Sequence, residues 1–152
     1  MGCVTKRVLV LVLTFVLVSM VACQNRAGPG GSTASALPPT PEAGKATVVG
    51  RVFSRQTSQP ITNTPVRLAE VHRMSEDGDG AFILDDAFSP GAITDHQGNF
   101  VIANVEAREY VIVIGDVNVQ YDVIAEPSGK AQIWNAVADQ VLDVGELRVN
   151  FH

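Results

Sequence analysis

The chain of 152 residues is 46% apolar and 18% charged, and its 11 basic and 16 acidic residues give a net charge of −5. This acidic balance argues against nucleic acid and against electrostatic binding to anionic lipid, and it leaves cations, neutral glycans and proteins open as partners. The same net negative charge is also explained by solubility alone, without any binding function. Two cysteines, Cys3 and Cys23, give no disulfide framework, so the fold must rest on burial of a core.

The first 22 residues have the layout of an export signal. Lys6 and Arg7 precede an apolar run at 8–18, and mostly small residues follow at 19–22. The apolar stretch is shorter than the about 20 residues that a membrane-spanning helix needs. We predict a signal peptide over 1–22, with an uncleaved anchor helix and a signal without lipid attachment as alternatives. N-myristoylation is disfavoured because Lys6 stands where that modification wants Ser or Thr.

The end of this segment carries a second motif. Met20-Val21-Ala22-Cys23 resembles the lipobox of bacterial lipoproteins. The resemblance implies cleavage after Ala22 and a diacylglycerol, with fatty acids such as palmitate, on Sγ of Cys23. The mature protein would then be exported and lipid-anchored to the cell membrane or outer membrane of a bacterium, because two or more acyl chains hold stably. Without Lys6 and Arg7 the chain has 9 basic and 16 acidic residues, a net charge of −7.

Residues 23–45 form a compositional break between the signal and the rest. The segment is rich in Gly and Pro and has almost no large apolar side chains. Such a chain cannot bury enough surface to offset the entropy of ordering. We predict a disordered linker with an r.m.s. reach of roughly 25 Å, which would let a small domain stand clear of the lipid headgroups.

The sequence pattern of residues 46–152 predicts a single all-β domain. Short β-branched or alternating segments are separated by turns rich in Gly, Pro and Asp, and no sustained helical period is present. Residues 82–84 are either a short strand or part of an excursion. We expect an antiparallel β-sandwich of about seven strands, which include 47–53, 66–71, a hairpin over 92–102, 109–114, a hairpin that joins 120–125 to 132–137, and 142–151.

Five segments of this domain share a pattern with a known family: Val49–Val52, Pro60–Ile61, Thr64–Leu68, Thr94–Ile102 and Val141–Leu147. They resemble the carboxypeptidase regulatory-like module. The resemblance implies a transthyretin-like Greek-key sandwich and an accessory, non-catalytic role. Two features depart from the pattern: Arg108 stands where the family has Gly, and the stretch between Met74 and Gly91 is longer than the usual connection.

The residues that match the pattern have plain structural roles. Asp95 can cap a turn with its side chain, and Gly98 can take the positive φ that the turn needs. Gly50 lies in the first strand, and Phe100 is expected to point into the core. Tyr110 can bury its ring and give its hydroxyl to a backbone acceptor, as tyrosine corners do in sandwiches.

The acidic loop over 75–86 is the one candidate for a metal site. On an EF-hand template Asp77 and Asp79 fall at positions 3 and 5 and Asp86 at position 12, with Ser75 at position 1 in place of a carboxylate. We consider calcium ligation by Asp77, Asp79 and Asp86 and favour the alternative, a solvated surface loop. No other cofactor is predicted.

Three further groups of residues are weaker candidates for a functional site. His72, His96 and His152 match no zinc motif. Four aromatic residues could form a sugar-stacking platform, although single aromatics in strands usually belong to the core: Trp134, Tyr121, Phe88 and Phe53. Lys45 and Asn150 have the order of an isopeptide pair, but no acid is clearly placed to assist them.

These observations predict a non-enzymatic, membrane-anchored module that binds or supports an envelope protein or glycan. A calcium-dependent adhesion or sensing module is the first alternative. A hydrolase with an unrecognised site is the second. The loop over 75–91 is where the sequence favours a binding function, because long loops on rigid sandwiches tend to carry it.

Overall fold

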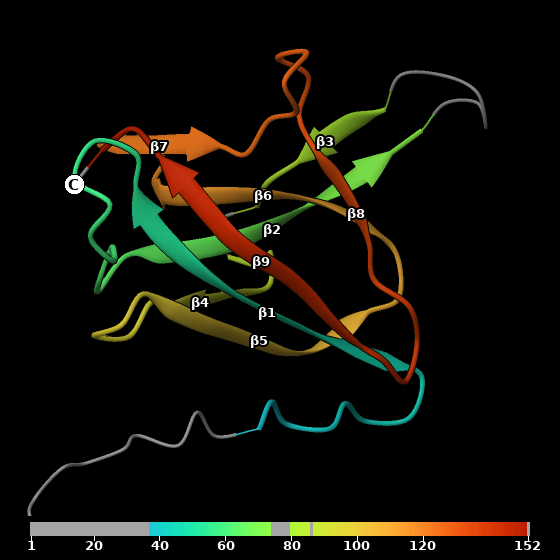
Figure 1. The fold of residues 1–152 in the computed structure, drawn as a ribbon. Coiled ribbons are helices and arrows are strands. Elements are labelled where there is room, and N and C mark those ends of the chain that lie inside the picture. The colour runs from blue at the N-terminus through green and yellow to red at the C-terminus, as the bar shows by residue number, and fades with distance from the viewer. Residues whose placement is uncertain (1–36, 74–79, 86, 152) are drawn as a thin grey trace, which may run out of the picture. The chain divides into compact units, whose positions relative to one another are not determined.

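A computed structural model of the chain describes residues 37–73, 80–85 and 87–151. These residues form nine strands and no helix, so none of them provides a helical membrane span. The prediction of an all-β domain is confirmed. The strands, labelled in Figure 1, are β1 Lys45–Ser54, β2 Pro65–His72, β3 Ala81–Ile83, β4 Gly91–Ile93, β5 Asn99–Glu106, β6 Glu109–Asp116, β7 Gln120–Val123, β8 Ile133–Asn135 and β9 Val141–Val149.

The strands make two sheets that pack as a sandwich. The smaller sheet has the order β5-β1-β9. In the larger sheet β2 and β6 lie at the centre, β3 and β4 both pair with β2, and β7 and β8 both pair with β6. Each outer edge of the larger sheet is therefore formed by two short strands in place of one long strand. The sequence predicted about seven strands, and the described residues hold nine, among them β3, which overlaps the stretch 82–84 that the sequence had left open.

One pair of strands is parallel, which corrects the prediction of a purely antiparallel sandwich. β1 and β9 run in the same direction, with Thr47 beside Val141 and Ser54 beside Val149 (Figure 1). Parallel pairing needs a long connection, and here the whole domain separates the first strand from the last. The register shifts between Val49 and Arg51, opposite Gly145, whose φ is +71°.

The predicted hairpin over 92–102 is wrong as a pairing, although its turn is present. β4 pairs with β2 and β5 pairs with β1, so the turn at Asp95–Gly98 carries the chain from one sheet to the other. The second predicted hairpin is paired only next to its turn, where Ala125 bridges Ala131 and the Gln132 amide donates to the Ile124 carbonyl. β7 and β8 pair with different parts of β6, and between them residues 124–132 leave the sheet as a narrow loop closed by the Ala125–Ala131 bridge. We call this loop the excursion.

The core lies between the two sheets and follows the alternation of side chains along each strand. Inward residues of β2 and β6 are buried, Val66 and Leu68 on one strand and Tyr110, Ile112 and Ile114 on the other. From the smaller sheet they meet Val48, Val52, Phe100, Ile102, Val105, Leu147 and Val149. Burial of such side chains is the main favourable term for a domain that has no disulfide.

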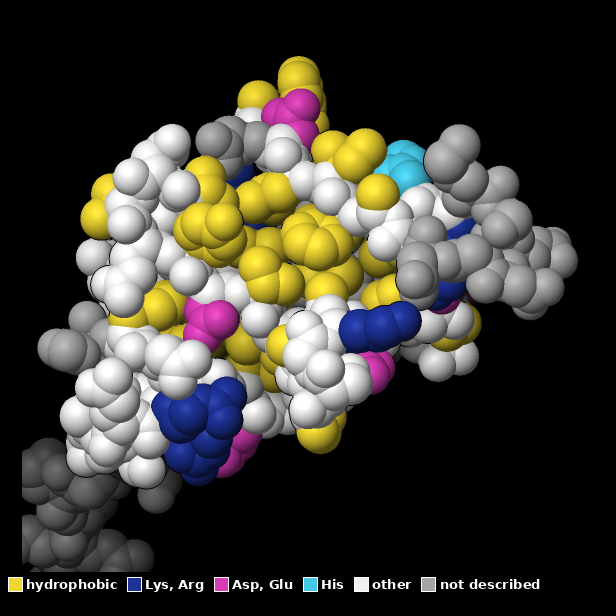
Figure 2. Space-filling view, turned by 90° about the horizontal axis from the view of Figure 1, so that it is seen from above, with side chains coloured by type: hydrophobic (Ala, Val, Ile, Leu, Met, Phe, Trp, Pro, Cys, Tyr) yellow, Lys and Arg dark blue, Asp and Glu magenta, His cyan; other side chains and the backbone are white. Residues whose placement is uncertain are grey.

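A second apolar cluster covers the outer face of the larger sheet. Ala69, Val111 and Val113 are buried there, and partly buried side chains pack around them, among them Leu84 and Val123. β6 is therefore buried on both faces, which explains why its sequence is continuously apolar instead of alternating. Figure 2, seen from above, shows hydrophobic side chains gathered in a broad area of the molecule's face.

The ordered domain begins before the predicted boundary at residue 46. The backbone N–H of Glu42 donates to Oδ1 of Asn104 at 2.9 Å, and Nδ2 of Asn104 donates back to Oε1 of Glu42 at 2.9 Å. The Gly44 amide donates to Asp139 Oδ1 at 2.8 Å. Backbone polar groups that find partners on the domain hold residues 42–45 in place, although their composition is that of a linker.

Candidate ligand-binding cleft

A cleft of about 650 Å³ opens where the two sheets part at one edge of the sandwich. β9 is the last strand of the smaller sheet, and on the other side the excursion leaves the edge of β6 between β7 and β8. No strand pairing joins these two edges in the described part of the chain, so side chains alone line the gap. They are Arg55, Asp122, Val123, Ile124, Ala125, Glu126, Pro127, Gln132, Trp134, Val144, Glu146, Leu147, Arg148 and Asn150.

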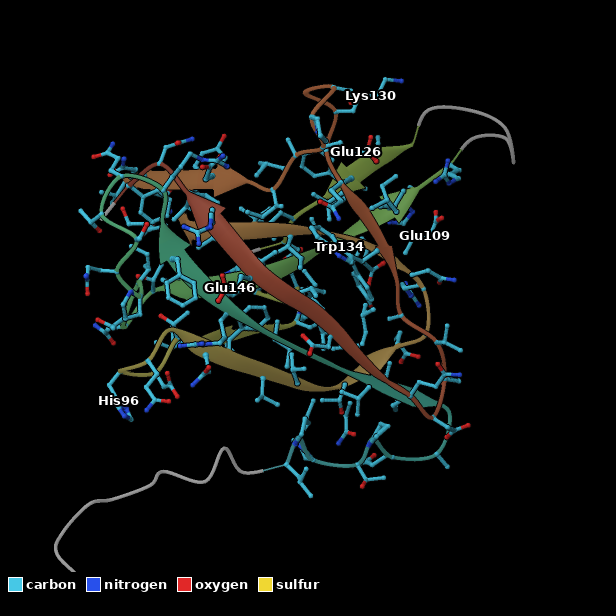
Figure 3. All side chains as sticks on the ribbon, in the orientation of Figure 1. His96, Glu109, Glu126, Lys130, Trp134 and Glu146 are labelled. Atoms are coloured by element: carbon cyan, nitrogen blue, oxygen red, sulfur yellow. The ribbon has the colours of Figure 1, made fainter. Side chains whose placement is uncertain are left out.

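Trp134 forms the aromatic part of the cleft. It pairs with Tyr110 across β8 and β6, so its side chain takes the inward side of the sheet. It packs against the core cluster and is only partly buried, because β8 lies at an edge where the smaller sheet does not cover it. Figure 3 labels Trp134 on β8, Glu126 in the excursion and Glu146 on β9, three elements that border the cleft.

One end of the cleft is closed by a polar contact between the sheets. Oδ2 of Asp122, on β7, accepts hydrogen bonds from the backbone N–H of Asn150 at 3.2 Å and from its Nδ2 at 3.3 Å. The Asn150 carbonyl in turn accepts from Nε2 of Gln56 at 3.1 Å. These bonds fix the end of β9 against β7, so the position of the cleft wall is defined at this end.

The rest of the polar lining mixes donors with acceptors. Nη2 of Arg55 donates to the Arg148 carbonyl at 3.1 Å, and Nη2 of Arg148 lies 3.5 Å from Oε2 of Glu146. Gln132 adds an amide, which can donate and accept. The cleft therefore combines an aromatic surface with carboxylates, guanidinium groups and amides, a set suited to a polar ligand that has apolar faces.

The four aromatic residues proposed as a sugar platform are not brought together. Trp134 alone among them lines the cleft. Tyr121 pairs with Gly115 on β6 and is 53% exposed, Phe88 lies in the β3–β4 connection and is 86% exposed, and Phe53 lies on β1 in the other sheet. The structure places the Trp134 side chain on the inward side of its sheet.

Sequence reasoning missed the polar residues that line the cleft with Trp134. Arg55, Asp122 and Asn150 come from segments far apart in the chain, and only Asn150 had been considered, for a different role. One signal was present: Asp122 pairs with the buried Ile114, so parity places an acid on the inward side of the strand. Only the pairing of β7 with β6, which the sequence did not predict, makes that parity visible.

The proposed calcium ligands Asp77, Asp79 and Asp86 and the proposed lipid-bearing Cys23 lie outside the described residues. Within the described residues no group of three or more His, Cys, Asp or Glu side chains is arranged to hold a metal ion.

The isopeptide alternative is wrong, because Lys45 and Asn150 lie at opposite ends of the parallel pair. Lys45 precedes the Thr47–Val141 position and Asn150 follows the Ser54–Val149 position. Lys45 forms an ion pair with Glu106, and this contact lowers the pKa of the Glu106 carboxyl.

The scaffold residues singled out from the sequence build the sheet crossing. Oδ1 of Asp95 accepts from the amides of Gln97 and Asn99, each at 2.8 Å, and Gly98 has a φ of +79°. Burial acts to raise the pKa of Asp95, but hydrogen bonds from the Asn99 side chain and from the Asn99 and Gln97 amides outweigh it and lower the pKa. Phe100, two residues beyond the turn, is buried in the core.

Tyr110 and Gly50 take equally defined places. The Tyr110 hydroxyl donates to the Glu106 carbonyl at 3.1 Å, and burial raises the pKa of Tyr110 to about 12. A Cβ on Gly50 would lie 2.7 Å from Cγ2 of Val144 and 3.0 Å from the Phe100 ring. Glycine at position 50 therefore leaves the space that the side chains of Val144 and Phe100 occupy.

Comparisons with known proteins give no family. No family model and no curated protein matches the chain. Among solved structures, similarity is found to a 9R-lipoxygenase from Cyanothece (TM-score 0.41, 15% identity, 74% of this chain and 18% of that one). A candidate carbohydrate-binding protein from Pseudomonas aeruginosa matches with TM-score 0.43 and 16% identity over 72% of this chain and 92% of its own. The group B streptococcus pilus 2b backbone protein matches with TM-score 0.42 and 9% identity over 68% and 40%. Likenesses this distant carry no argument about function.

Proposed function

We propose that the protein is an exported, lipid-anchored β-sandwich that binds a neutral glycan in the cleft beside Trp134. The observation that carries the proposal is the composition of this cleft. A partly buried indole lies among carboxylate, guanidinium and amide groups at an open edge of the sandwich. On this account the module acts by binding and has no catalytic role.

A sugar ring has the chemistry that such a lining recognises. Each hydroxyl is both a donor and an acceptor, so it pairs with Asp122, Glu126 and Glu146 as acceptors and with the arginines and amides as donors. The C–H face of the ring is apolar and packs on an aromatic side chain. The lining carries three carboxylates and two guanidinium groups, so a neutral polyol finds strong acceptors and strong donors there without needing a charge of its own.

The anchoring half of the proposal rests on the sequence. Residues 1–22 have the layout of a signal peptide, and Cys23 closes a lipobox-like motif. The kinship with carboxypeptidase regulatory-like modules and their transthyretin-like topology belongs to the same proposal. In this arrangement the membrane holds the module, and the cleft faces the glycans or glycoproteins of the envelope.

Isothermal titration of the purified chain 23–152 with chitotetraose, cellotetraose and maltotetraose tests the binding half. We expect at least one to bind, Gln132→Ala to weaken it by about five- to tenfold, and Tyr121→Ala, an exposed aromatic outside the cleft, to leave it unchanged. Binding that survives in Gln132→Ala and fails in Tyr121→Ala would place the site elsewhere. Shorter oligosaccharides released during the titration would favour the hydrolase alternative.

Mass spectrometry of the mature N-terminus tests the anchoring half. We expect a first residue Cys23 that carries acyl chains, and a Cys23→Ser variant that leaves the membrane fraction. A Cys23→Ser variant that stays with membranes as firmly as the wild type would contradict lipid anchoring.

A further inference from the structure

Two arginines flank one phenylalanine beside the cleft, on the outer face of the smaller sheet, and a third arginine lies next to them. The guanidinium carbon of Arg51 lies 4.8 Å from the centre of the Phe53 ring, and that of Arg148 lies 5.8 Å from it. Arg55 joins them through its bond to the Arg148 carbonyl. The parallel register of β1 and β9 sets Phe53 beside Arg148, so the group follows directly from the strand pairing. We call these four residues the arginine patch.

The patch carries positive charge that the protein neutralises only in part. Arg51 donates to the Gln97 carbonyl at 3.2 Å and Arg55 to the Arg148 carbonyl, and neither acceptor is ionised. Among the described residues, Glu146 supplies the carboxylate within ion-pair distance of the patch, with its Oε2 3.5 Å from Nη2 of Arg148. Other basic residues form closer ion pairs with carboxylates: Lys45 with Glu106, Arg73 with Glu109 and Arg108 with Glu70. The patch is thus a local cationic surface on a chain whose net charge is −5.

The chain enters the domain across the same face. Thr47 is an outward residue of β1 and is nevertheless fully buried, with its hydroxyl donating to the Pro39 carbonyl at 3.2 Å. In Figure 1 the residues that precede β1, in cyan, run below β5, away from β6 and β7. Thirteen positions, 24–36, separate Cys23 from Leu37, and if they form the linker that the sequence predicts, a coil of that length has an r.m.s. reach of about 20 Å. A tether of this reach would keep the domain close to the lipid, and it would leave the choice of face to the domain's own surface.

We propose that the arginine patch rests on the phosphate groups of anionic phospholipids in the membrane that carries Cys23. Guanidinium groups bind phosphate oxygens through paired hydrogen bonds, and Phe53 between them suits the boundary between headgroups and acyl chains. The proposal rests on the anchoring half of the proposed function. It goes further, because it assigns the domain an orientation: the outer face of the smaller sheet lies toward the membrane, and the cleft opens beside it.

The net negative charge of the protein decides how strong this contact is. Long-range repulsion from an anionic surface is screened beyond about 8 Å at physiological salt, whereas each arginine that reaches the headgroups adds a short-range attraction. Three arginines alone would not hold an untethered protein of net negative charge on an anionic membrane. A tether raises the local concentration of the patch at the surface, so a weak contact is enough to orient the anchored domain.

The test uses the chain 23–152, in which Cys23 is the single cysteine. Its thiol is coupled to a maleimide lipid in vesicles of phosphatidylcholine alone or with 40% phosphatidylglycerol. Modification of each arginine by phenylglyoxal is then followed by mass spectrometry. We expect Arg51, Arg55 and Arg148 to react at least threefold more slowly on the anionic vesicles. Arg73, directly after β2, and Arg108, in the turn between β5 and β6, are internal controls and should react at equal rates on both.

Two outcomes would overturn the orientation. Equal rates for Arg51, Arg55 and Arg148 on the two vesicles would show that the patch does not meet the lipid, and equal slowing of all five arginines would show a contact without orientation. Protection confined to the patch and lost in 0.5 M NaCl supports the proposal. Chemical coupling replaces cellular acylation, so failure here leaves the biological anchor and the glycan site to be judged by their own experiments.

Discussion

The buried hydroxyl of Tyr110 makes stability depend on pH at the scale of one residue. The side chain is 1% exposed, and burial raises its pKa to about 12, whereas an unfolded tyrosine titrates near 10. The folded protein therefore keeps a proton that the unfolded chain loses. The stability that Tyr110 provides is complete below pH 10 and is lost as the pH rises from 10 to 12, by about 2 kcal/mol.

Urea unfolding at pH 8, 10 and 11.5 checks this prediction against Tyr110→Phe. The variant lacks the bond to the Glu106 carbonyl and should be about 1 kcal/mol less stable at pH 8. It should also lose less stability than the wild type above pH 10. The exposed Tyr121 supplies the control, since Tyr121→Phe should keep the wild-type pH profile. Equal profiles for wild type and Tyr110→Phe would contradict the account.

Gly98 and Gly129 have similar backbone conformations but different surroundings, so replacing each one with Ala separates the cost of backbone strain from the cost of steric crowding. Gly98 has a φ of +79° and Gly129 a φ of +85°. A Cβ on Gly98 would lie 2.5 Å from the Val52 carbonyl oxygen, whereas a Cβ on Gly129 would meet nothing within 4 Å. Gly129→Ala should cost about 1 kcal/mol, the price of the left-handed conformation, and Gly98→Ala at least twice as much. Thermal unfolding measures both, and equal losses would refute a special role for the sheet-crossing turn.

At the scale of elements, the continuous apolar sequence of β6 is explained by burial on both faces. Val113 points to the outer face of the larger sheet yet is only 2% exposed. Val113→Ala should therefore destabilise the fold by about 2 kcal/mol, as a core substitution does. Val101, on the outer face of the smaller sheet and 43% exposed, is the matched control and should cost less than about 0.5 kcal/mol. Similar values from urea unfolding would show that the outer cluster contributes nothing.

The sequence predicted most strands and turns because these depend on local patterns. Alternation at 66–71, the β-branched run at 109–114 and the Asp95–Gly98 turn are all legible in a short window. Partners are not local. Adjacent strands around a tight turn read as a hairpin, and nothing in 92–102 reveals that β4 and β5 belong to different sheets. The parallel β1–β9 pair, about 90 residues apart in sequence, could not be derived from either strand alone.

At the scale of the whole molecule, the cleft exists because two sheet edges face one another without pairing. Trp134 was named from the sequence as one of four candidate aromatics, and its pairing with Tyr110 places its side chain on the inward side of the sheet. Arg55, Asp122 and Asn150 could not be found in the same way, because they meet only after β1, β7 and β9 have been placed. The sequence therefore predicted the class of fold but not the residues of the cleft. The site depends on how the two sheets are set against each other.

The central claim, that the cleft beside Trp134 holds a glycan, is tested most directly by the fluorescence of that residue. Trp134 is the single tryptophan of the chain, so its emission reports on the cleft alone. Titration with the oligosaccharide that binds in calorimetry should shift the emission to shorter wavelength, with the same dissociation constant, as the sugar displaces water from the indole. Saturation of the calorimetric signal with an unchanged emission spectrum would contradict the claim.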